Sequence, residues 1–124
     1  MKCVLIVDDD SDVRDLVTYK LEREGFEVRT AVDGEAALED VQERTPDLVL
    51  LDIMMPGISG LDVLKRWRGE AATARLPVIM LTARAQEADV DLGFEFKADD
   101  YIVKPFSPRE LVRRVNAVLM RVPR

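Results

Sequence analysis

Five polar residues in this 124-residue chain each stand where a short apolar run ends. They are three aspartates, a threonine and a lysine, far apart in the sequence: Asp8, Asp9, Asp52, Thr82 and Lys104. In an open parallel sheet, the carboxyl ends of the strands form one edge, and that edge holds the ligand site. The sequence therefore predicts a shallow pocket with three carboxylates, a hydroxyl and an amine, suited to a divalent cation and a phosphoryl group.

The first acidic cluster has the composition of a magnesium site. Asp8, Asp9 and Asp10 are adjacent carboxylates that repel one another, and a cation would relieve that repulsion. Mg²⁺ prefers oxygen ligands and typically uses one or two carboxylates, waters and phosphate oxygens. Asp9 and Asp52 are the expected direct ligands, with Asp8 acting through water. The alternative for this cluster is a solvated turn in which Asp10 or Ser11 caps the next helix.

Asp52 is the candidate nucleophile. It ends a run of four aliphatic residues, where a buried carboxylate is costly unless it is paired. It could cap a loop or helix, but a carboxylate can also attack phosphorus to form an aspartyl phosphate. A metal ion bound beside it would neutralise charge on the transferring group.

Thr82 and Lys104 are the candidate phosphate contacts. The hydroxyl of Thr82 can cap the following segment or donate to a phosphoryl oxygen, and the sequence favours the two roles about equally. Lys104 follows the last apolar run, where a counter-ion to phosphate is favoured over a solvated charge. Pro105 favours a cis bond that would aim this lysine inward.

The elements that must position these residues alternate along the chain. Apolar runs predict strands over residues 4–7, 26–30, 48–51, 78–81 and 101–103, the second being more polar and therefore at a sheet edge. Helical spacing fills the intervals, including a short helix over 86–95. Right-handed crossovers then give a doubly wound, flavodoxin-like (βα)5 sandwich with a five-stranded parallel sheet in the order 2-1-3-4-5.

Each helix is expected to bury an apolar stripe. The stripes are Val13, Leu16, Val17 and Leu21 in the first helix, Ala37, Leu38 and Val41 in the second, Leu61, Leu64 and Trp67 in the third, and Leu111, Val115, Val118 and Leu119 in the last. Gly25 is expected just after the first helix, and Asp33 is expected to cap the second. A capping box that begins at Ser107 opens the last helix.

Composition excludes several functions. With 24 acidic and 18 basic residues, the formal charge is -6, so direct binding of this domain to nucleic acid is not expected. Cys3 is the only cysteine and histidine is absent, which removes an internal disulfide, a cysteine zinc site and the commonest general base. The apolar runs are too short to span a membrane or to form a signal peptide, so a cytoplasmic location is expected.

These residues also carry a family resemblance. The chain resembles the receiver domain of bacterial two-component response regulators, and is most similar to the winged-helix subgroup of the OmpR/PhoB type. The matching stretches are residues 7–9, 52–57, 81–83 and 98–106, and the match runs essentially end to end.

The resemblance implies a function for the acidic residues. Asp52 would accept a phosphoryl group from a sensor histidine kinase. Asp9, Asp52 and the main-chain carbonyl of Met54 would ligate Mg²⁺, with Asp8 in an outer position. The chain would thus be a signalling switch rather than an enzyme, although it takes part in its own phosphorylation and dephosphorylation. Because the Met54 side chain cannot orient a water, slow self-dephosphorylation is expected.

The resemblance also implies how the signal leaves the site. Thr82 and Lys104 would contact the phosphoryl oxygens, and Tyr101 would turn inward as Thr82 moves toward them. The alternative is that Tyr101 has only a structural role, as a strand residue packed on the face of the sheet. The switching surface would be the face of the fourth helix, fifth strand and fifth helix, and the expected output that it controls is transcription.

Members of the subgroup form homodimers through that same face. Charged positions that match it are Asp99, Asp100, Glu110, Arg114 and Arg121. This chain departs from the pattern at Val90, where a basic residue is usual, and at Asp91, which adds a negative charge. Glu110 then lacks its usual cross-dimer partner. Lys97 stands where the family usually has glycine, and a left-handed backbone there would cost about 1 kcal/mol.

Residues 1–121 are expected to form the receiver domain. Residues 122–124 would begin a linker, because Pro123 cannot extend the last helix. The resemblance favours an output domain beyond Arg124 over a receiver that stands alone.

Two other functions were weighed. A phosphatase similar to the haloacid dehalogenase class would use Asp8 as nucleophile and Asp10 as acid, but the chain is short for that class and leaves Asp52 without a role. A receiver-like interaction module that is never phosphorylated would not need the complete residue set. Absence of Mg²⁺ binding would favour that module.

Overall fold

Five parallel strands form one sheet in the order β2-β1-β3-β4-β5, as predicted. The computed structural model describes residues 1–83 and 97–121. The strands are β1 (Cys3–Val7), β2 (Glu27–Ala31), β3 (Leu48–Asp52), β4 (Val78–Thr82) and β5 (Asp100–Val103). Each predicted strand is present, with its ends shifted by no more than about one residue.

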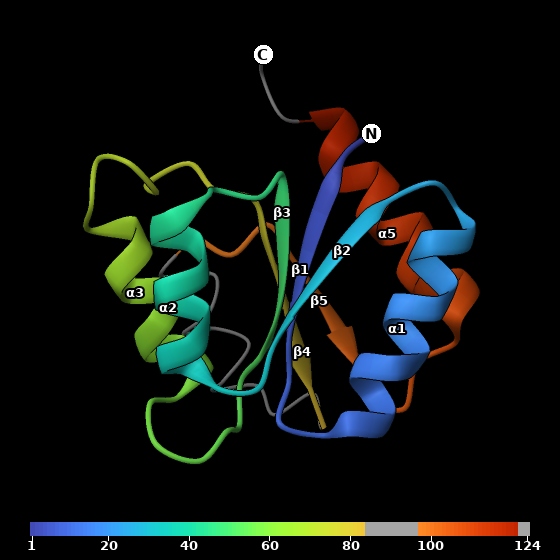
Figure 1. Cartoon of the computed structure of the whole chain (residues 1–124), viewed down its shortest axis with the longest axis horizontal. Helices are drawn as coiled ribbons and strands as arrows, with labels where there is room; N and C mark the ends of the chain where they lie inside the picture. The colour runs from blue at the N-terminus through green and yellow to red at the C-terminus, as the bar shows by residue number, and fades with distance from the viewer. Residues whose placement is uncertain (84–96, 122–124) are drawn as a thin grey trace.

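Four helices of the described residues cover the two faces of the sheet. They are α1 (Ser11–Arg23), α2 (Gly34–Glu43), α3 (Gly60–Arg68) and α5 (Pro108–Arg121). Figure 1 shows α2 and α3 on one side of the sheet and α1 and α5 on the other, which is the doubly wound arrangement. The helix predicted over 86–95 lies outside the described residues, as do Val90, Asp91 and the 122–124 segment.

The three central strands are buried along their whole length. Every residue of β1, β3 and β4 is buried because helices cover both faces. Alternate residues enter separate cores: Leu5 and Leu51 pack with α2 and α3, whereas Ile6 and Leu50 pack with α1 and α5. β2 lies at the sheet edge and is only partly buried, as predicted from its polar sequence.

The predicted helix stripes are largely correct, with one error and two omissions. Val17 and Leu21 are buried as expected, but Leu16 is 44% exposed. Successive helical residues are about 100° apart, so Leu16 lies beside the stripe rather than in it. Val63 and Val112 are buried although they were not predicted to be. Val63 faces α2, since a Cβ added at Gly34 would stand 2.9 Å from its Cγ2.

The helix caps follow the sequence. Asp10 caps α1 by accepting from the Asp12 N–H at 2.8 Å, and Asp33 caps α2 by accepting from Ala36. The Ser107 hydroxyl accepts from the Glu110 N–H at 3.0 Å. Gly25 follows α1 with a φ of 93°, in the left-handed region that favours glycine. α1 therefore starts directly after the acidic cluster that follows β1.

Lys97 has a left-handed backbone, with a φ of 66°. A neighbouring helix compensates for the cost of this conformation. Arg68, at the end of α3, donates from Nε and Nη2 to the Lys97 carbonyl at 3.1 and 3.0 Å, and from Nη1 to the Leu76 carbonyl at 2.7 Å. Arg68 thus ties α3 to the segments that enter β4 and β5.

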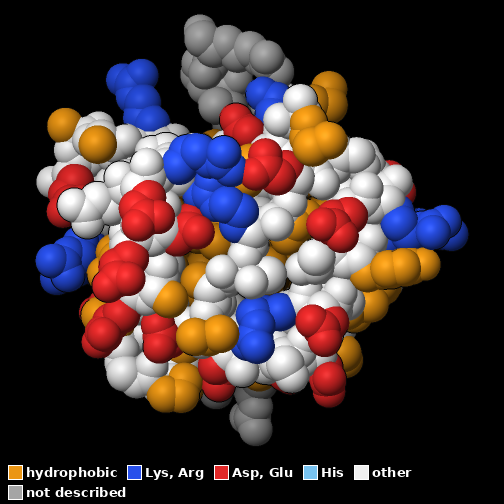
Figure 2. Space-filling view, viewed as in Figure 1, with side chains coloured by type: hydrophobic (Ala, Val, Ile, Leu, Met, Phe, Trp, Pro, Cys, Tyr) orange, Lys and Arg blue, Asp and Glu red, His pale blue; other side chains and the backbone are white. Residues whose placement is uncertain are grey.

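The surface is acidic where α2 is exposed. α2 carries Glu35, Glu39, Asp40 and Glu43 and no basic residue. In Figure 2, acidic side chains gather on the left of the displayed face, over α2. Such a surface repels nucleic-acid phosphates. Within residues 1–83 and 97–121, no helix has both the length and the apolar character needed to cross a membrane.

Candidate functional site

The predicted site residues meet at the carboxyl edge of the sheet. Asp52 and Thr82 are the last residues of β3 and β4, while Asp8 directly follows β1 and Lys104 directly follows β5. The strands are in parallel register, with Asp52 beside Leu81 and Thr82 beside Val103. Strand ends from four parts of the chain therefore present their side chains at one level.

Three carboxylates are close enough to share one cation. One oxygen from each of Asp8, Asp9 and Asp52 lies within 4.8 Å of the others. Asp8 and Asp52 are buried and Asp9 is exposed, so the cluster opens to solvent on one side. Three oxygen donors of like charge at this separation fit a hard divalent cation such as Mg²⁺, which completes its shell with water.

Asp8 is held from two sides. Its Oδ1 accepts from the Asp10 N–H at 2.9 Å, and its Oδ2 lies 2.7 Å from Nζ of Lys104. Asp8 has no exposed surface. Asp8 is thus the most enclosed of the three carboxylates, in agreement with the outer position expected for it.

Asp52 is the carboxylate whose ionisation is most disturbed. Burial is the main cause, and with the charge of Asp8 it raises the pKa of Asp52 to about 6. Two contacts oppose the rise: Nζ of Lys104 lies 3.5 Å from Oδ2, and the Met54 N–H donates to Oδ1 at 3.2 Å. The group is thus ionised at neutral pH but more basic than an ordinary aspartate.

Lys104 bridges the two buried carboxylates. Burial disfavours its charge, but its hydrogen bond to Asp8 and the charges of Asp52 and Asp8 outweigh burial and raise the pKa of Lys104. The Lys104–Pro105 peptide bond is cis, and the lysine points inward, as predicted. Its main-chain N–H donates to the Thr82 carbonyl at 2.6 Å, which fixes the lysine beside β4.

The structure places the remaining predicted residues as follows. Thr82 is buried next to Asp52 in the sheet order. Met54 follows Asp52 in the loop, and its side chain is 70% exposed. Tyr101 is buried in the core on the α2 and α3 side of the sheet. That position agrees with a sheet-packing role, and the switch role of Tyr101 stays a prediction.

Gly60 is a site residue that the sequence argument missed. A Cβ at this position would stand 2.1 Å from the Asp52 carbonyl oxygen, closer than any real contact. The Gly60 N–H also donates to the Ile53 carbonyl at 2.9 Å. The start of α3 therefore rests directly on the backbone that carries Asp52. The available signal was the second of two glycines in the loop after the candidate nucleophile, eight residues beyond Asp52.

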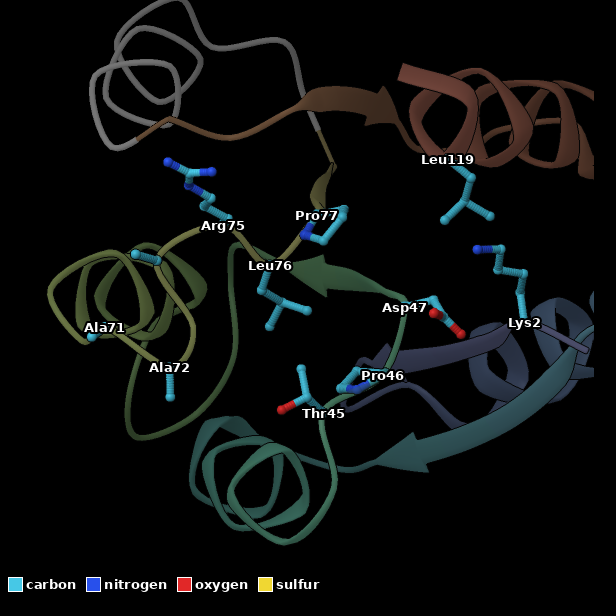
Figure 3. Close-up of a pocket in the computed structure, with 11 residues that line it drawn as sticks. Lys2, Thr45, Pro46, Asp47, Ala71, Ala72, Arg75, Leu76, Pro77 and Leu119 are labelled. Atoms are coloured by element: carbon cyan, nitrogen blue, oxygen red, sulfur yellow. The ribbon is translucent and has the colours of Figure 1, made fainter. Parts of the chain in front are cut away.

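A cavity of about 380 Å³ lies near the amino ends of the strands, at the opposite end of the sheet from the acidic cluster (Figure 3). Its lining includes Lys2, Asp47 and Pro77, which precede β1, β3 and β4. None of the five polar residues at the carboxyl strand ends lines it. Ligands of open parallel sheets bind at the carboxyl edge, so we place the chemistry at the acidic cluster and not in this cavity.

This chain is similar to known proteins in both sequence and fold. Residues 4–116 match the family model described as the response regulator receiver domain. The chain is 48% identical over 119 residues to the phosphate regulon transcriptional regulatory protein PhoB of Klebsiella pneumoniae, covering 96% of the chain and 52% of that protein. It is 47% identical to the alkaline phosphatase synthesis transcriptional regulatory protein PhoP of Bacillus subtilis, covering 97% and 49%. The chain thus spans about half the length of these curated relatives.

Solved structures agree with this similarity. A response regulator from Chloroflexus aurantiacus superposes with a TM-score of 0.92 at 42% identity, covering 97% of this chain and 98% of that one. The chemotaxis protein CheY4 of Vibrio cholerae superposes with a TM-score of 0.91 at 33% identity, covering 95% and 98%. The comparisons give no support to the phosphatase alternative.

Proposed function

The chain belongs to the response regulator receiver domain family, and from this premise we propose that Asp52 accepts a phosphoryl group from a sensor histidine kinase. The observation that carries the proposal is the position of the Asp52 carboxylate. It lies within 4.8 Å of two further carboxylates and 3.5 Å from a lysine ammonium. This combination suits a carboxylate that attacks phosphorus beside a cation.

The proposed transfer forms one bond and breaks one. A carboxylate oxygen of Asp52 forms a bond to phosphorus while the bond from phosphorus to the kinase's histidine nitrogen breaks. The electron pair of that bond stays on the histidine nitrogen, and the ring leaves as neutral imidazole because its other nitrogen carries a proton, taken from water before the transfer. Lys104 and the hydroxyl of Thr82 would interact with oxygens of the transferring group. Thr82 ends β4, which is next to β3, and Lys104 follows β5, the strand beyond β4.

Magnesium is the proposed cofactor. We assign it to the carboxylates of Asp9 and Asp52 and the main-chain carbonyl of Met54, with Asp8 orienting a bound water. The support is the cluster of three carboxylates around a single inward lysine. The ammonium of Lys104 neutralises only part of their negative charge, so a cation is needed to balance the rest. When bound, Mg²⁺ would neutralise charge on the phosphoryl oxygens.

The test is covalent labelling. Wild-type protein incubated with a small phosphodonor and Mg²⁺ should gain the mass of one phosphoryl group, and Asp52→Asn should gain none. Asp62→Asn is the charge control, since Asp62 lies exposed on α3. A label on Asp8, labelling without Mg²⁺, or repeated turnover of a phosphomonoester would contradict the proposal.

The output is also a proposal, because the chain spans only half of its curated relatives. Their names describe transcriptional regulators. We infer that phosphorylation at Asp52 changes the face of the predicted fourth helix, the fifth strand and the fifth helix, and that this face controls transcription through a separate DNA-binding domain. The predicted fourth helix lies outside the described residues. The Tyr101 switch, the cytoplasmic location and the linker that begins at 122–124 remain predictions within this proposal.

Dimerisation through that face is the proposed mode of output. Its charged residues already have partners within the chain: Arg114 lies 3.1 Å from Asp100 and 3.5 Å from Glu110. Arg121 donates to the Asp99 carbonyl at 3.3 Å. A dimer that used these charges would have to break contacts within each chain in order to form contacts between the chains. We therefore propose a weak, phosphorylation-dependent homodimer.

A further inference from the structure

We propose that Arg14 is a positioning residue for the metal site, and that it sets the direction of the Asp9 carboxylate by holding the peptide bond between Asp8 and Asp9. The inference rests on the proposed function, because it concerns the cation that assists phosphorylation of Asp52. Among the described residues, Arg14 makes no hydrogen bond or ion pair with the predicted ligand oxygens or with Asp52, so its effect must pass through the backbone.

The contact joins a helix to the end of a strand. Arg14 lies in α1, and its Nη1 donates to the main-chain carbonyl of Asp8 at 2.8 Å. Its own N–H donates to the Asp10 carbonyl at 3.1 Å, so the backbone of Arg14 is fixed in the first turns of the helix. The half-buried side chain therefore reaches back from a rigid element to the last peptide group before Asp9.

The other polar groups of Asp8 are bound by different elements. Its N–H donates to the Ala31 carbonyl at 3.2 Å, and its two carboxylate oxygens accept from Asp10 and Lys104. Those bonds fix the Asp8 side chain and the strand end. Among the described residues, only Arg14 donates a hydrogen bond to the Asp8 carbonyl. That carbonyl shares a rigid plane with the Asp9 nitrogen.

Asp9 depends on that plane for its position. Its side chain is exposed, and within the described part of the chain no hydrogen bond or ion pair holds its carboxylate. An oxygen of Asp9 nevertheless stays within 4.8 Å of oxygens of Asp8 and Asp52, although three like charges repel. Because side-chain contacts do not hold it there, the backbone must. Arg14 restrains that backbone in the way that outer groups orient metal ligands.

The experiment removes the donor and then restores it. Arg14→Met keeps most of the side-chain length and loses the hydrogen bond, whereas Arg14→Lys restores a single donor. Arg23→Met is the matched control: it removes the same charge from the same helix, but Arg23 contacts Tyr19 and not the acidic cluster. Mg²⁺ affinity is measured by calorimetry on the unphosphorylated protein, and stability by urea unfolding in EDTA.

We expect Arg14→Met to bind Mg²⁺ about tenfold more weakly than wild type, the lower end of effects seen for outer-shell groups. Arg14→Lys should recover most of that loss, and Arg23→Met should bind like wild type. The Mg²⁺ concentration that half-saturates phosphorylation by a small donor should rise by the same factor, while the rate at saturating Mg²⁺ is retained. A purely structural role would lower the urea midpoint and leave the affinity of the folded protein unchanged.

Three results would overturn the inference: unchanged Mg²⁺ affinity in Arg14→Met, an equal loss in Arg23→Met, or a fall in the saturated rate without a shift in Mg²⁺ dependence. These are distinguishable from failure of the proposed function. If wild type neither binds Mg²⁺ nor is labelled at Asp52, the proposed function fails. If wild type does both and Arg14→Met does so equally well, only the role of Arg14 fails.

Discussion

At the scale of single residues, Asp52 is a group that its surroundings disfavour in the ionised state. Burial and the Asp8 charge raise its pKa from 3.8 to about 6, even with Lys104 nearby. An aspartate whose folded pKa lies above its unfolded pKa lowers stability once it ionises. In its ionised state the Asp52 carboxylate therefore opposes folding, and we expect a bound cation to relieve this effect.

That conflict predicts a pH-dependent effect of Asp52→Asn. Between pH 3.8 and about 6 the folded state binds more protons at this group than the unfolded state, so its contribution to stability falls as pH rises through this window. Without Mg²⁺, Asp52→Asn should raise the free energy of unfolding by about 1–2 kcal/mol above this window, and by less below it. Urea unfolding in EDTA on both sides of the window measures the difference. A gain that is the same at both pH values would show that ionisation is not the cause.

From the side chain of Met54, we expect phosphorylated Asp52 to lose its phosphoryl group slowly. Its exposed thioether follows Asp52 by two residues and cannot orient an attacking water through a strong hydrogen bond. Met54→Asn supplies both a donor and an acceptor, and it should shorten the lifetime of phosphorylated Asp52 several-fold. The lifetime is followed by mass spectrometry after removal of the donor, with Met54→Leu as the apolar control. Equal lifetimes in Met54→Asn and wild type would count against this role.

At the scale of elements, the start of α3 and the end of β3 form one unit. Gly60 leaves no room for a Cβ beside the Asp52 carbonyl, so the first turn of α3 fixes the distance between the helix and the nucleophile's backbone. The Ser59 hydroxyl caps this turn by accepting from the Asp62 N–H at 3.2 Å. The loop between Asp52 and Gly60 is therefore anchored at both ends.

Gly60→Ala should disturb both stability and chemistry. The added methyl must push the helix away from β3, with a cost of about 1–3 kcal/mol in unfolding free energy, and it should slow labelling of Asp52. Gly69→Ala, at the other end of α3, is the control, because the nearest atoms would stand at 3.6 Å, an ordinary contact. Thermal unfolding and the labelling rate are compared for both variants. If the two variants behave alike, the close approach at Gly60 is not important.

The elements were predictable because periodicity is a local property. Runs of buried aliphatic residues identified β1, β3 and β4, and the caps at Asp10, Asp33 and Ser107 follow from short-range chemistry. Leu16 was misplaced because a pattern of apolar residues does not show how wide a helix's contact with the sheet is.

The site was predictable for a related reason: the topology brings strand ends together whatever fills the loops. Asp8, Asp52 and Lys104 could thus be grouped before their distances were known. The bond from Arg14 to the Asp8 carbonyl and the approach of Gly60 to Asp52 could not be predicted. Both involve main-chain atoms whose positions depend on the packed structure and not on residue type.

At the scale of the whole molecule, the proposed dimer can be tested by measuring the apparent molecular mass of the protein in solution. With Mg²⁺ and a non-hydrolysable phosphoryl mimic, we expect the apparent mass to rise with protein concentration, and we expect a monomer without the mimic. Arg114→Ala should change this response, because it removes contacts with Asp100 and Glu110. Arg23→Ala is the control, because Arg23 lies at the carboxyl end of α1, away from the acidic cluster at its amino end. Sedimentation velocity separates the two states, and a mass that is independent of the mimic would contradict the proposal.

The pair formed by Asp8 and Lys104 joins positions 96 residues apart. A ribosome releases the chain from its amino end, so an emerging polypeptide carries its acidic residues long before the lysine that completes them. Until the fifth strand has docked, the acidic cluster lacks the ammonium group that lies beside Asp8 and Asp52. If Asp52 is the phosphoacceptor, as proposed, we expect copies that lack the fifth strand to be poor substrates for a phosphodonor, because they lack Lys104.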